Sequence, residues 1–320
     1  MKKRVPLRRA ANKKLANERD RRHRYTRQMP VPYRFAICNE LFEKRPFAEV
    51  CPRLRTLGYE GIELAPFTLG EDPAALPRAE RAELAAQIAD AGLSFVGLHW
   101  LLAAPPGLHV TARDEKQRRH TWDYVGRLID MCAELAHASR SGNPVIVFGS
   151  PKQRSSNGGL SPGECVDIFR EEMARAAPRA EAGGVTLLIE ALSPSQTDVV
   201  TSLAEAVEIV EQIQSPAVQT MFDVHNAIDE TEPHTELVRK FQRHIRHVHV
   251  NEMDGREPGM GDYAFEPLLA TLAELEYPGW VSVEAFDFSR DSYDVASRAI
   301  SHLKAAISYG APSGVAAHIL

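Results

Sequence analysis

The sequence predicts a (β/α)8 barrel, in which eight parallel strands are enclosed by helices, on three observations. Short apolar runs alternate eight times with longer stretches whose apolar residues recur at helical spacing. The alternation occupies about 275 residues, which is typical of this fold. The first run is followed by Asn39, Glu40, Leu41 and Phe42, whereas a doubly wound open sheet, the runner-up, would normally place a glycine-rich phosphate loop there.

The predicted strands are the short apolar runs. They lie at 34–38, 61–64, 94–99, 144–148, 185–190, 218–223, 245–251 and 280–284. The predicted helices lie at 46–57, 78–91, 114–138, 161–182, 202–213, 235–241, 265–275 and 292–307. Two helix starts carry a capping signal: Ser161 is followed by Pro162, and Ser202 stands three residues before Glu205.

Charge divides the chain unevenly. Residues 1–30 hold twelve Lys and Arg against Glu18 and Asp20, so this segment carries +10 and the remainder −15 within a total of −5. Because residues 1–32 have few apolar residues and no clear period, we expect a basic, disordered tail; a basic arm that contacts nucleic acid or a partner is the alternative. No linker divides the remainder, so we expect one catalytic domain over 33–310 and a C-terminal tail over 311–320.

Composition disfavours several classes of protein. The four cysteines are scattered without a CxxC pair, which fits a reducing cytoplasm and indicates neither a disulfide framework nor a thiolate zinc site. No apolar run approaches the roughly 20 residues of a membrane span. The acidic body is a poor surface for nucleic acid. We therefore expect a cytoplasmic enzyme that binds neither membrane nor nucleic acid.

Four successive predicted strands end in an acid or a histidine: Glu190, Asp223, His249 and Glu284. A single strand-end glutamate is more often a salt-bridge partner or a helix cap. Four such residues at the rim where a barrel places its active site indicate one shared divalent metal ion. The oxygen-rich set suits Mn²⁺, Mg²⁺ or Co²⁺ better than a closed structural Zn²⁺ site.

The motifs around these residues carry a resemblance. They read IEAL at Glu190, FDVHN at Asp223, HVHVNE at His249 and VEAF at Glu284, at intervals of 33, 26 and 35 residues. The chain resembles the sugar phosphate isomerase/epimerase family with a xylose-isomerase-like barrel, which includes ketose 3-epimerases of the tagatose/psicose type and hydroxypyruvate isomerase. The resemblance covers about residues 34–306. It implies a metal-dependent isomerase or epimerase of a sugar, sugar phosphate or sugar acid, and a homo-dimer or homo-tetramer.

The resemblance also implies roles. Glu190 and Glu284 would ligate the metal, with Mn²⁺ as the first expectation and Mg²⁺, Co²⁺ or Zn²⁺ as alternatives, and act as the catalytic acid/base pair. The metal would chelate substrate oxygens and stabilise an enediolate. One glutamate would remove a proton and the other would return it to the opposite face or to the neighbouring carbon. His225 and Arg256 would contact substrate. The alternative for His225 is a loop histidine without a role, and the alternative for Arg256 is a surface arginine paired with Glu257 or Asp262.

Further candidates for substrate binding lie in the first half of the chain. His99 and Trp100 end the third strand and would line a sugar pocket, unless they are core residues. Glu63 ends the second strand and would orient a ligand by a hydrogen bond, unless it is simply structural. Lys152 and Arg154, in the loop FGSPKQRSS, would bind a phosphate or carboxylate, unless the loop is only solvated.

Other functions remain open at this point. A lyase or dehydratase on a keto-sugar or keto-inositol would share the barrel and the ligands. An endonuclease-IV-like DNA-repair enzyme would need more histidines than the strand ends supply. A non-catalytic binding protein on the same barrel would have no need of the complete ligand set.

Overall fold

The predicted barrel is confirmed. In a computed structural model that describes residues 31–309, eight parallel strands form a closed barrel in the order β1 to β8. The strands are β1 (Arg34–Cys38), β2 (Gly61–Leu64), β3 (Ser94–Leu98), β4 (Val145–Phe148), β5 (Thr186–Ile189), β6 (Val218–Asp223), β7 (Ile245–Val250) and β8 (Trp280–Val283). Several end one residue before the predicted bound, so Glu190, His99 and Glu284 lie just beyond their strands.

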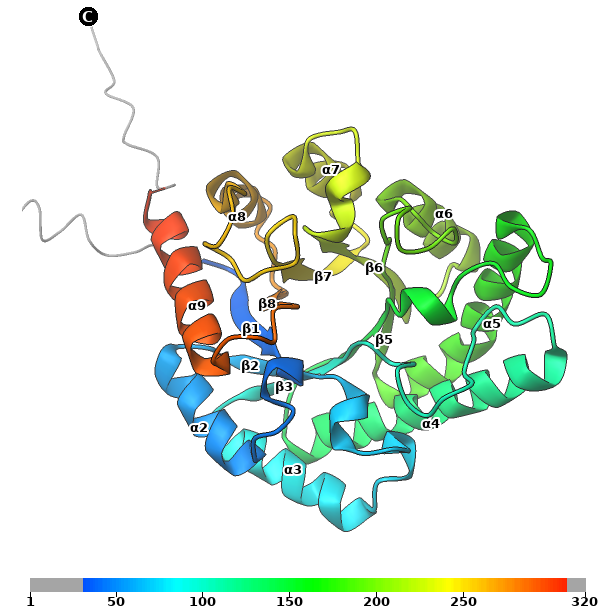
Figure 1. Cartoon of the computed structure of the whole chain (residues 1–320), viewed down its shortest axis with the longest axis horizontal. Coiled ribbons are helices and arrows are strands. Elements are labelled where there is room, and N and C mark those ends of the chain that lie inside the picture. The colour runs from blue at the N-terminus through cyan, green and yellow to red at the C-terminus, as the bar shows by residue number, and fades with distance from the viewer. Residues whose placement is uncertain (1–30, 310–320) are drawn as a thin grey trace, which may run out of the picture. The chain divides into compact units, whose positions relative to one another are not determined.

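Helices surround this barrel and follow the strands in alternation (Figure 1). They are α2 (Phe47–Leu57), α3 (Arg78–Asp90), α4 (Glu115–Ala138), α5 (Pro162–Gly183), α6 (Leu203–Ile213), α7 (His234–Phe241), α8 (Phe265–Glu274) and α9 (Ser292–Tyr309). Ser161 forms a capping box with Glu164 at the start of α5, with Pro162 at the first helical position, as its sequence indicates. Ser202 caps α6 by accepting a hydrogen bond from the backbone of Glu205.

Pairing of the first and last strands closes the barrel. β1 pairs with β8 in a register that sets Ile37 opposite Val283, and with β2 in a register that sets Cys38 opposite Glu63. Because every strand runs in the same direction, all the carboxyl ends meet at one rim. The closure therefore brings the end of β1 next to the end of β8, with the end of β2 on the other side of β1.

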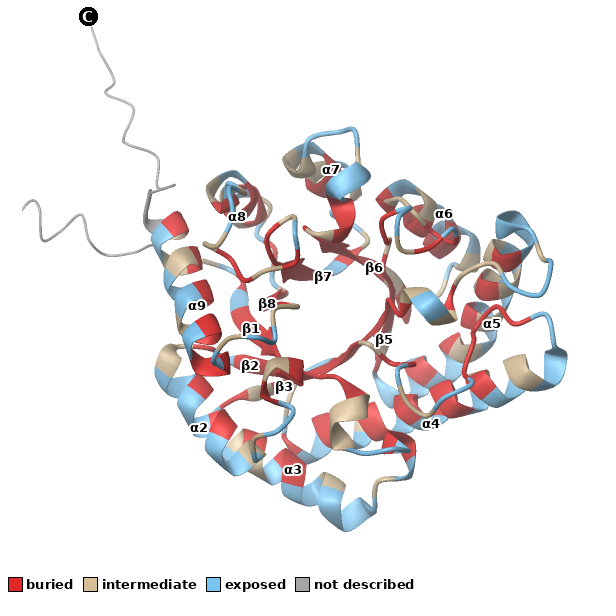
Figure 2. Ribbon diagram, in the orientation of Figure 1, coloured by how far each residue is buried: buried red, intermediate tan, exposed pale blue. Residues whose placement is uncertain are grey.

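The barrel interior is filled by side chains. A buried cluster lies inside it, formed by Ala36, Val96, Val145, Val147, Leu188, Met221 and Trp280. The indole of Trp280 fits because residue 61 is a glycine: a Cβ on Gly61 would come within 2.9 Å of the ring. Figure 2 shows the strands buried and the outward faces of the helices exposed. The packed interior confines chemistry to the rim.

Two predictions concern the ends of the chain. Residues 1–30 and 310–320, which hold most of the expected N-terminal tail and all of the expected C-terminal tail, lie outside the described residues. No helix within 31–309 is both long and apolar enough to cross a membrane.

Candidate functional site

Four side chains from successive strand ends meet at the rim. They are Glu190, Asp223, His249 and Glu284, and one donor atom of each lies within 4.8 Å of the others. All four are buried, with exposed fractions between 0% and 7%. The structure thus brings together the four residues that the sequence analysis singled out as metal ligands.

The orientation of the His249 ring separates its two nitrogens. Nε2 lies 3.2 Å from both oxygens of Glu63, which is fully buried and also lies 2.8 Å from Nε2 of His247. Nδ1 faces the other side, 3.1 Å from Glu284, 3.6 Å from Asp223 and 4.0 Å from Glu190. Since a carboxylate accepts a hydrogen bond from an imidazole N–H, Glu63 holds Nε2 and leaves Nδ1 directed at the three carboxylates.

Two asparagines position the carboxylates. Asn226 donates two hydrogen bonds to them: its backbone N–H donates to Asp223 at 2.6 Å, and its side-chain amide donates to Glu190 at 3.0 Å. Asn251 donates to the second oxygen of Asp223 at 3.2 Å. Gly149, after β4, leaves room for the remaining oxygen of Glu190, because a Cβ there would overlap it. The carboxylates are therefore held in place from several elements.

Burial and mutual repulsion dominate the electrostatics. Burial raises the pKa of Glu190, and the charges of Asp223 and Glu284 raise it further. Burial and Glu284 likewise raise the pKa of Asp223. Burial works against ionisation of Glu284, but the charge of His249 lowers its pKa below the usual range. Three crowded carboxylates away from water are the arrangement that a bound cation relieves.

The residues present fit a divalent cation. Nδ1 of His249 is buried and, among residues 31–309, makes no hydrogen bond of acceptable geometry despite the nearby carboxylates. Three carboxylates and one imidazole form a hard, mainly oxygen donor set that suits Mn²⁺, Mg²⁺ or Co²⁺. These four residues are the ones that would hold the ion.

His225 lies beside this group. Its Nδ1 is 2.8 Å from the carbonyl of Met253, and its Nε2 is 3.5 Å from the amide of Gln196. That amide also donates to Asn226 at 2.7 Å, and the His225 ring stacks edge-on against Phe286. His225 is thus linked to the Glu190 carboxylate through two neighbouring side chains.

Trp100 forms part of an aromatic wall at the rim. Its ring lies 5.2 Å from that of Phe67 and 6.0 Å from that of Phe286. It lines a cavity of about 670 Å³ together with Glu40 and the half-exposed Phe288. His99 is instead buried, with its Nε2 2.9 Å from Glu40. Trp100 therefore faces accessible space, whereas His99 belongs to an inner layer.

Arg256 and Lys152 lie on surface loops. Arg256 forms an ion pair with Asp254 at 2.7 Å, a partner that the sequence analysis did not consider, and lines a second cavity of about 630 Å³ with His234 and Tyr263. Lys152 is exposed in a 3₁₀ helix, Pro151–Gln153. Their predicted contacts with substrate stay predictions.

Arg154 takes an inward course. Only 1% of the residue is exposed, and its guanidinium donates to the carbonyl of Phe148 at 2.6 Å and lies 5.6 Å from the ring of Phe169. Burial lowers its pKa to about 10. Within the described part of the chain, Nε and Nη2 have no hydrogen-bond partner. This conformation does not present the guanidinium to an anion in solvent.

Sequence reasoning missed three residues that build the site. Asn226 and Asn251 stand inside the motifs FDVHN and HVHVNE, so their place next to a ligand was a usable signal. Glu40 stands two residues beyond β1 and contacts His99 from a 3₁₀ helix, Asn39–Phe42. Nothing in the local sequence connects Glu40 with a residue 59 positions later.

The chain is similar to several known proteins, some of which are named for the conversion of sugars. A family model described as "Xylose isomerase-like TIM barrel" matches residues 51–306. A probable ketose 3-epimerase of Synechocystis is 23% identical over 72% of this chain and 75% of its own length. A putative hydroxypyruvate isomerase of Streptomyces coelicolor is 24% identical over 76% of this chain and 87% of its own. A D-psicose 3-epimerase determined in the presence of D-fructose superposes with a TM-score of 0.73 at 18% identity, over 86% of this chain and 99% of its own.

Proposed function

Because this chain belongs to the xylose isomerase-like TIM barrel family, we propose that it is a divalent-metal-dependent isomerase or epimerase of a sugar or sugar derivative. The observation that carries the proposal is the buried group of Glu190, Asp223, His249 and Glu284. Two glutamates and a cation site within one group of side chains are what proton transfer next to a carbonyl requires. The names of the relatives support the same reaction class.

The four residues would hold the ion, with Mn²⁺ as the first expectation. A cation there would polarise a substrate carbonyl and acidify the adjoining C–H. The protein fixes the direction of its own ligands: Glu63 turns Nδ1 of His249 toward the site, while Asn226 and Asn251 hold the carboxylates of Glu190 and Asp223.

Glu190 and Glu284 would carry the proton. They follow β5 and β8, which are not neighbouring strands, and their carboxylates therefore approach a bound substrate from different parts of the rim. One carboxylate removes the proton beside the carbonyl. The other, which starts protonated, delivers its own proton to the opposite face in an epimerisation, or to the neighbouring carbon in an isomerisation, and solvent exchange then restores both groups.

His225 and Trp100 are the residues that we propose to contact the sugar. His225 contacts Gln196, which donates a hydrogen bond to Asn226 beside the carboxylates. Trp100 lines the cavity that Glu40 also lines. An aromatic ring packs on the apolar face of a sugar, and an imidazole exchanges hydrogen bonds with hydroxyl groups.

The test is solvent-proton exchange. The full-length protein, loaded with Mn²⁺, would be incubated in D₂O with ketoses, ketose phosphates and keto-acids, and the products followed by NMR. We expect deuterium beside the carbonyl in a converted substrate and loss of this exchange in Glu190→Gln and Glu284→Gln. A dehydrated product would instead establish a lyase, and full activity of Glu190→Gln would overturn the proposed role of Glu190.

A further inference from the structure

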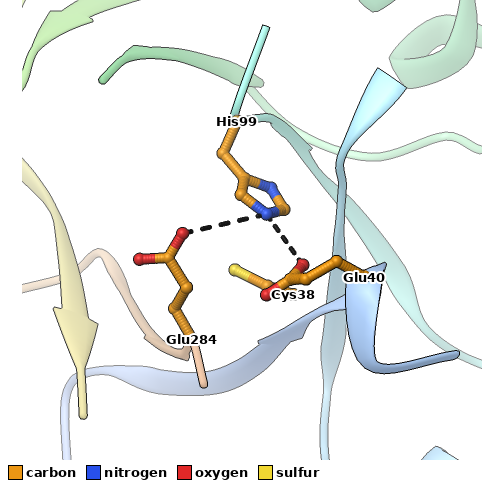
Figure 3. A group of neighbouring side chains, drawn as sticks. All are labelled: Cys38, Glu40, His99 and Glu284. Atoms are coloured by element: carbon orange, nitrogen blue, oxygen red, sulfur yellow. Dashed lines mark hydrogen bonds and ion pairs between the residues drawn. The ribbon is translucent and has the colours of Figure 1, made fainter. Parts of the chain in front are cut away.

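The two carboxylate oxygens of Glu284 face different histidines. Oε2 lies 3.1 Å from Nδ1 of His249, inside the group described above. Oε1 lies 4.0 Å from Nε2 of His99, on the other side of the carboxylate (Figure 3). Glu284 therefore stands between two sets of donor atoms, and only one of them belongs to the proposed function.

The second set consists of Cys38, Glu40, His99 and Glu284. One donor atom of each lies within 4.8 Å of the others. All four are at least nine-tenths buried, with exposed fractions of 0%, 3%, 1% and 7%. They come from the end of β1, the 3₁₀ helix after it, the end of β3 and the end of β8, and barrel closure places the ends of β1 and β8 side by side. This group combines a thiol, an imidazole and two carboxylates.

One carboxylate oxygen of this group lacks a hydrogen bond. Oε2 of Glu40 lies 2.9 Å from Nε2 of His99, but Oε1 of Glu40 has no partner among the residues that the structure describes. Buried polar atoms in folded proteins are almost always satisfied, and an unbound ion is one explanation of an exception. A cation bound by this group would satisfy Oε1 of Glu40.

Glu63 supports both histidines from below. It lies 3.2 Å from Nε2 of His249 and 3.7 Å from Nδ1 of His99. In each ring, the nitrogen that faces away from Glu63 faces a group of carboxylates. Histidines that bind metal ions commonly have a carboxylate at the other ring nitrogen. Glu63 occupies this place at both sets of donors, with a hydrogen bond at His249 and a longer ion pair at His99.

We propose that Cys38, Glu40, His99 and Glu284 form a second divalent-cation site, joined to the first through the Glu284 carboxylate. Thiolate, imidazole and carboxylate together suit Zn²⁺ or Co²⁺, while the three carboxylates of the first site suit harder ions. Binding of the ion displaces one proton from the Cys38 thiol into solvent, because the thiolate is the ligand. The second site rests on the proposed function only through Glu284.

Cobalt titration tests the site without an activity assay. The full-length protein, freed of metal by a chelator, is titrated with Co²⁺, and bound cobalt is counted by mass spectrometry after desalting. We expect two equivalents per chain and a thiolate-to-cobalt charge-transfer absorption in the near ultraviolet. Cys38→Ser should lose that absorption, and His99→Gln and Glu40→Gln should each reduce binding from two equivalents to one.

Matched variants separate ligand loss from general damage. Cys165→Ser changes another buried cysteine, in α5, and Glu43→Gln changes an exposed glutamate three residues from Glu40; both should keep two equivalents and the absorption. Asp223→Asn should remove the first equivalent and keep the absorption. Circular dichroism of every variant checks that the barrel is folded.

The outcomes distinguish this site from the proposed function. One equivalent in the wild type, lost in Asp223→Asn and kept in His99→Gln, overturns the second site and leaves the first intact. No bound cobalt overturns both. Two equivalents without the thiolate absorption, or with both retained in His99→Gln and Cys38→Ser, also overturn the assignment. Two equivalents that are lost separately in Asp223→Asn and His99→Gln establish it.

Discussion

His249 donates a hydrogen bond from Nε2 to Glu63, at 3.2 Å from each carboxylate oxygen. Burial alone would raise the pKa of Glu63, but the charges and hydrogen bonds of His247 and His249 hold it well below its usual range. The hydrogen bond to the ionised Glu63 fixes the orientation of the His249 ring and turns Nδ1 toward the carboxylates of Glu190, Asp223 and Glu284.

Replacing Glu63 should weaken cation binding. In Glu63→Gln the amide no longer accepts equally from both histidines, and we expect affinity at the first site to fall about 10- to 100-fold. A competition titration against a chromogenic chelator measures it. The control is Glu60→Gln, an exposed position three residues earlier, which should bind like the wild type. Unchanged affinity in Glu63→Gln would contradict the positioning role.

The bare backbone at Gly149 should matter to turnover. An added Cβ would overlap the carboxylate of Glu190, so Gly149→Ala should displace that oxygen and lower kcat by up to about 100-fold, as small misplacements of catalytic groups do. Gly142→Ala is the matched control, because within the described chain no heavy atom other than those of the glycine and its two chain neighbours lies within 4 Å of its Cβ position. Equal rates in the two variants would show that Glu190 has room to move.

Protonation of His234 should lower the free energy of unfolding when the pH falls below neutrality. Its Nε2 lies 3.2 Å from the carbonyl of Ala227 and its Nδ1 2.9 Å from the hydroxyl of Tyr263, which a neutral ring satisfies as donor and acceptor. Burial lowers the pKa of His234, so the unfolded chain binds the proton more readily. The contribution of His234 is complete above the unfolded pKa of about 6.5 and is lost as the pH falls below it.

Urea unfolding at pH 7.5 and 5.5 measures this effect. The wild type should lose more free energy of unfolding between the two pH values than His234→Gln does. His120→Gln, at an exposed position in α4, should keep the dependence of the wild type. The same slope in all three proteins would rule out His234 as its source.

Removal of the cation should destabilise the fold as well as abolish turnover. A ligand present at 100 times its dissociation constant adds about 2.7 kcal/mol to the free energy of unfolding. Chelation should therefore lower the melting temperature of the wild type, and the shift should be smaller in Asp223→Asn, which lacks a ligand of the first site. A chelator shift of equal size in that variant would show that no ion at the first site stabilises the fold.

The fold and the four candidate metal ligands could be predicted from the sequence because both depend on local sequence patterns. Each strand or helix is a periodic run, and the observed bounds differ from the predicted ones by a residue or two. The ligand types also stand where a strand stops, so Asp223 and His249 could be placed at the rim before their distances were known. Strand order did the rest, because parallel strands share one rim.

The contact between Glu40 and His99 could not be predicted in this way. Glu40 and His99 meet across 59 residues, and only the barrel geometry shows that they share a carboxylate with the first site. The direction of Arg154 could not be read for a different reason. A basic loop suggests an exposed cation, but here the loop turns the guanidinium inward, where it donates to Phe148 and lies over the ring of Phe169 in α5.

Closure of the barrel has a consequence for folding during synthesis of the chain. Cys38 and Ser282 lie 3.6 Å apart although 244 residues separate them, and Glu40 shares its donor group with Glu284. During synthesis β1 cannot pair with β8 until almost the whole chain has been made, because the two strands are very far apart in the sequence. Neither donor group is complete until β8 has left the ribosome. A cation that needs all four residues of either group would therefore bind only after β8 has been made.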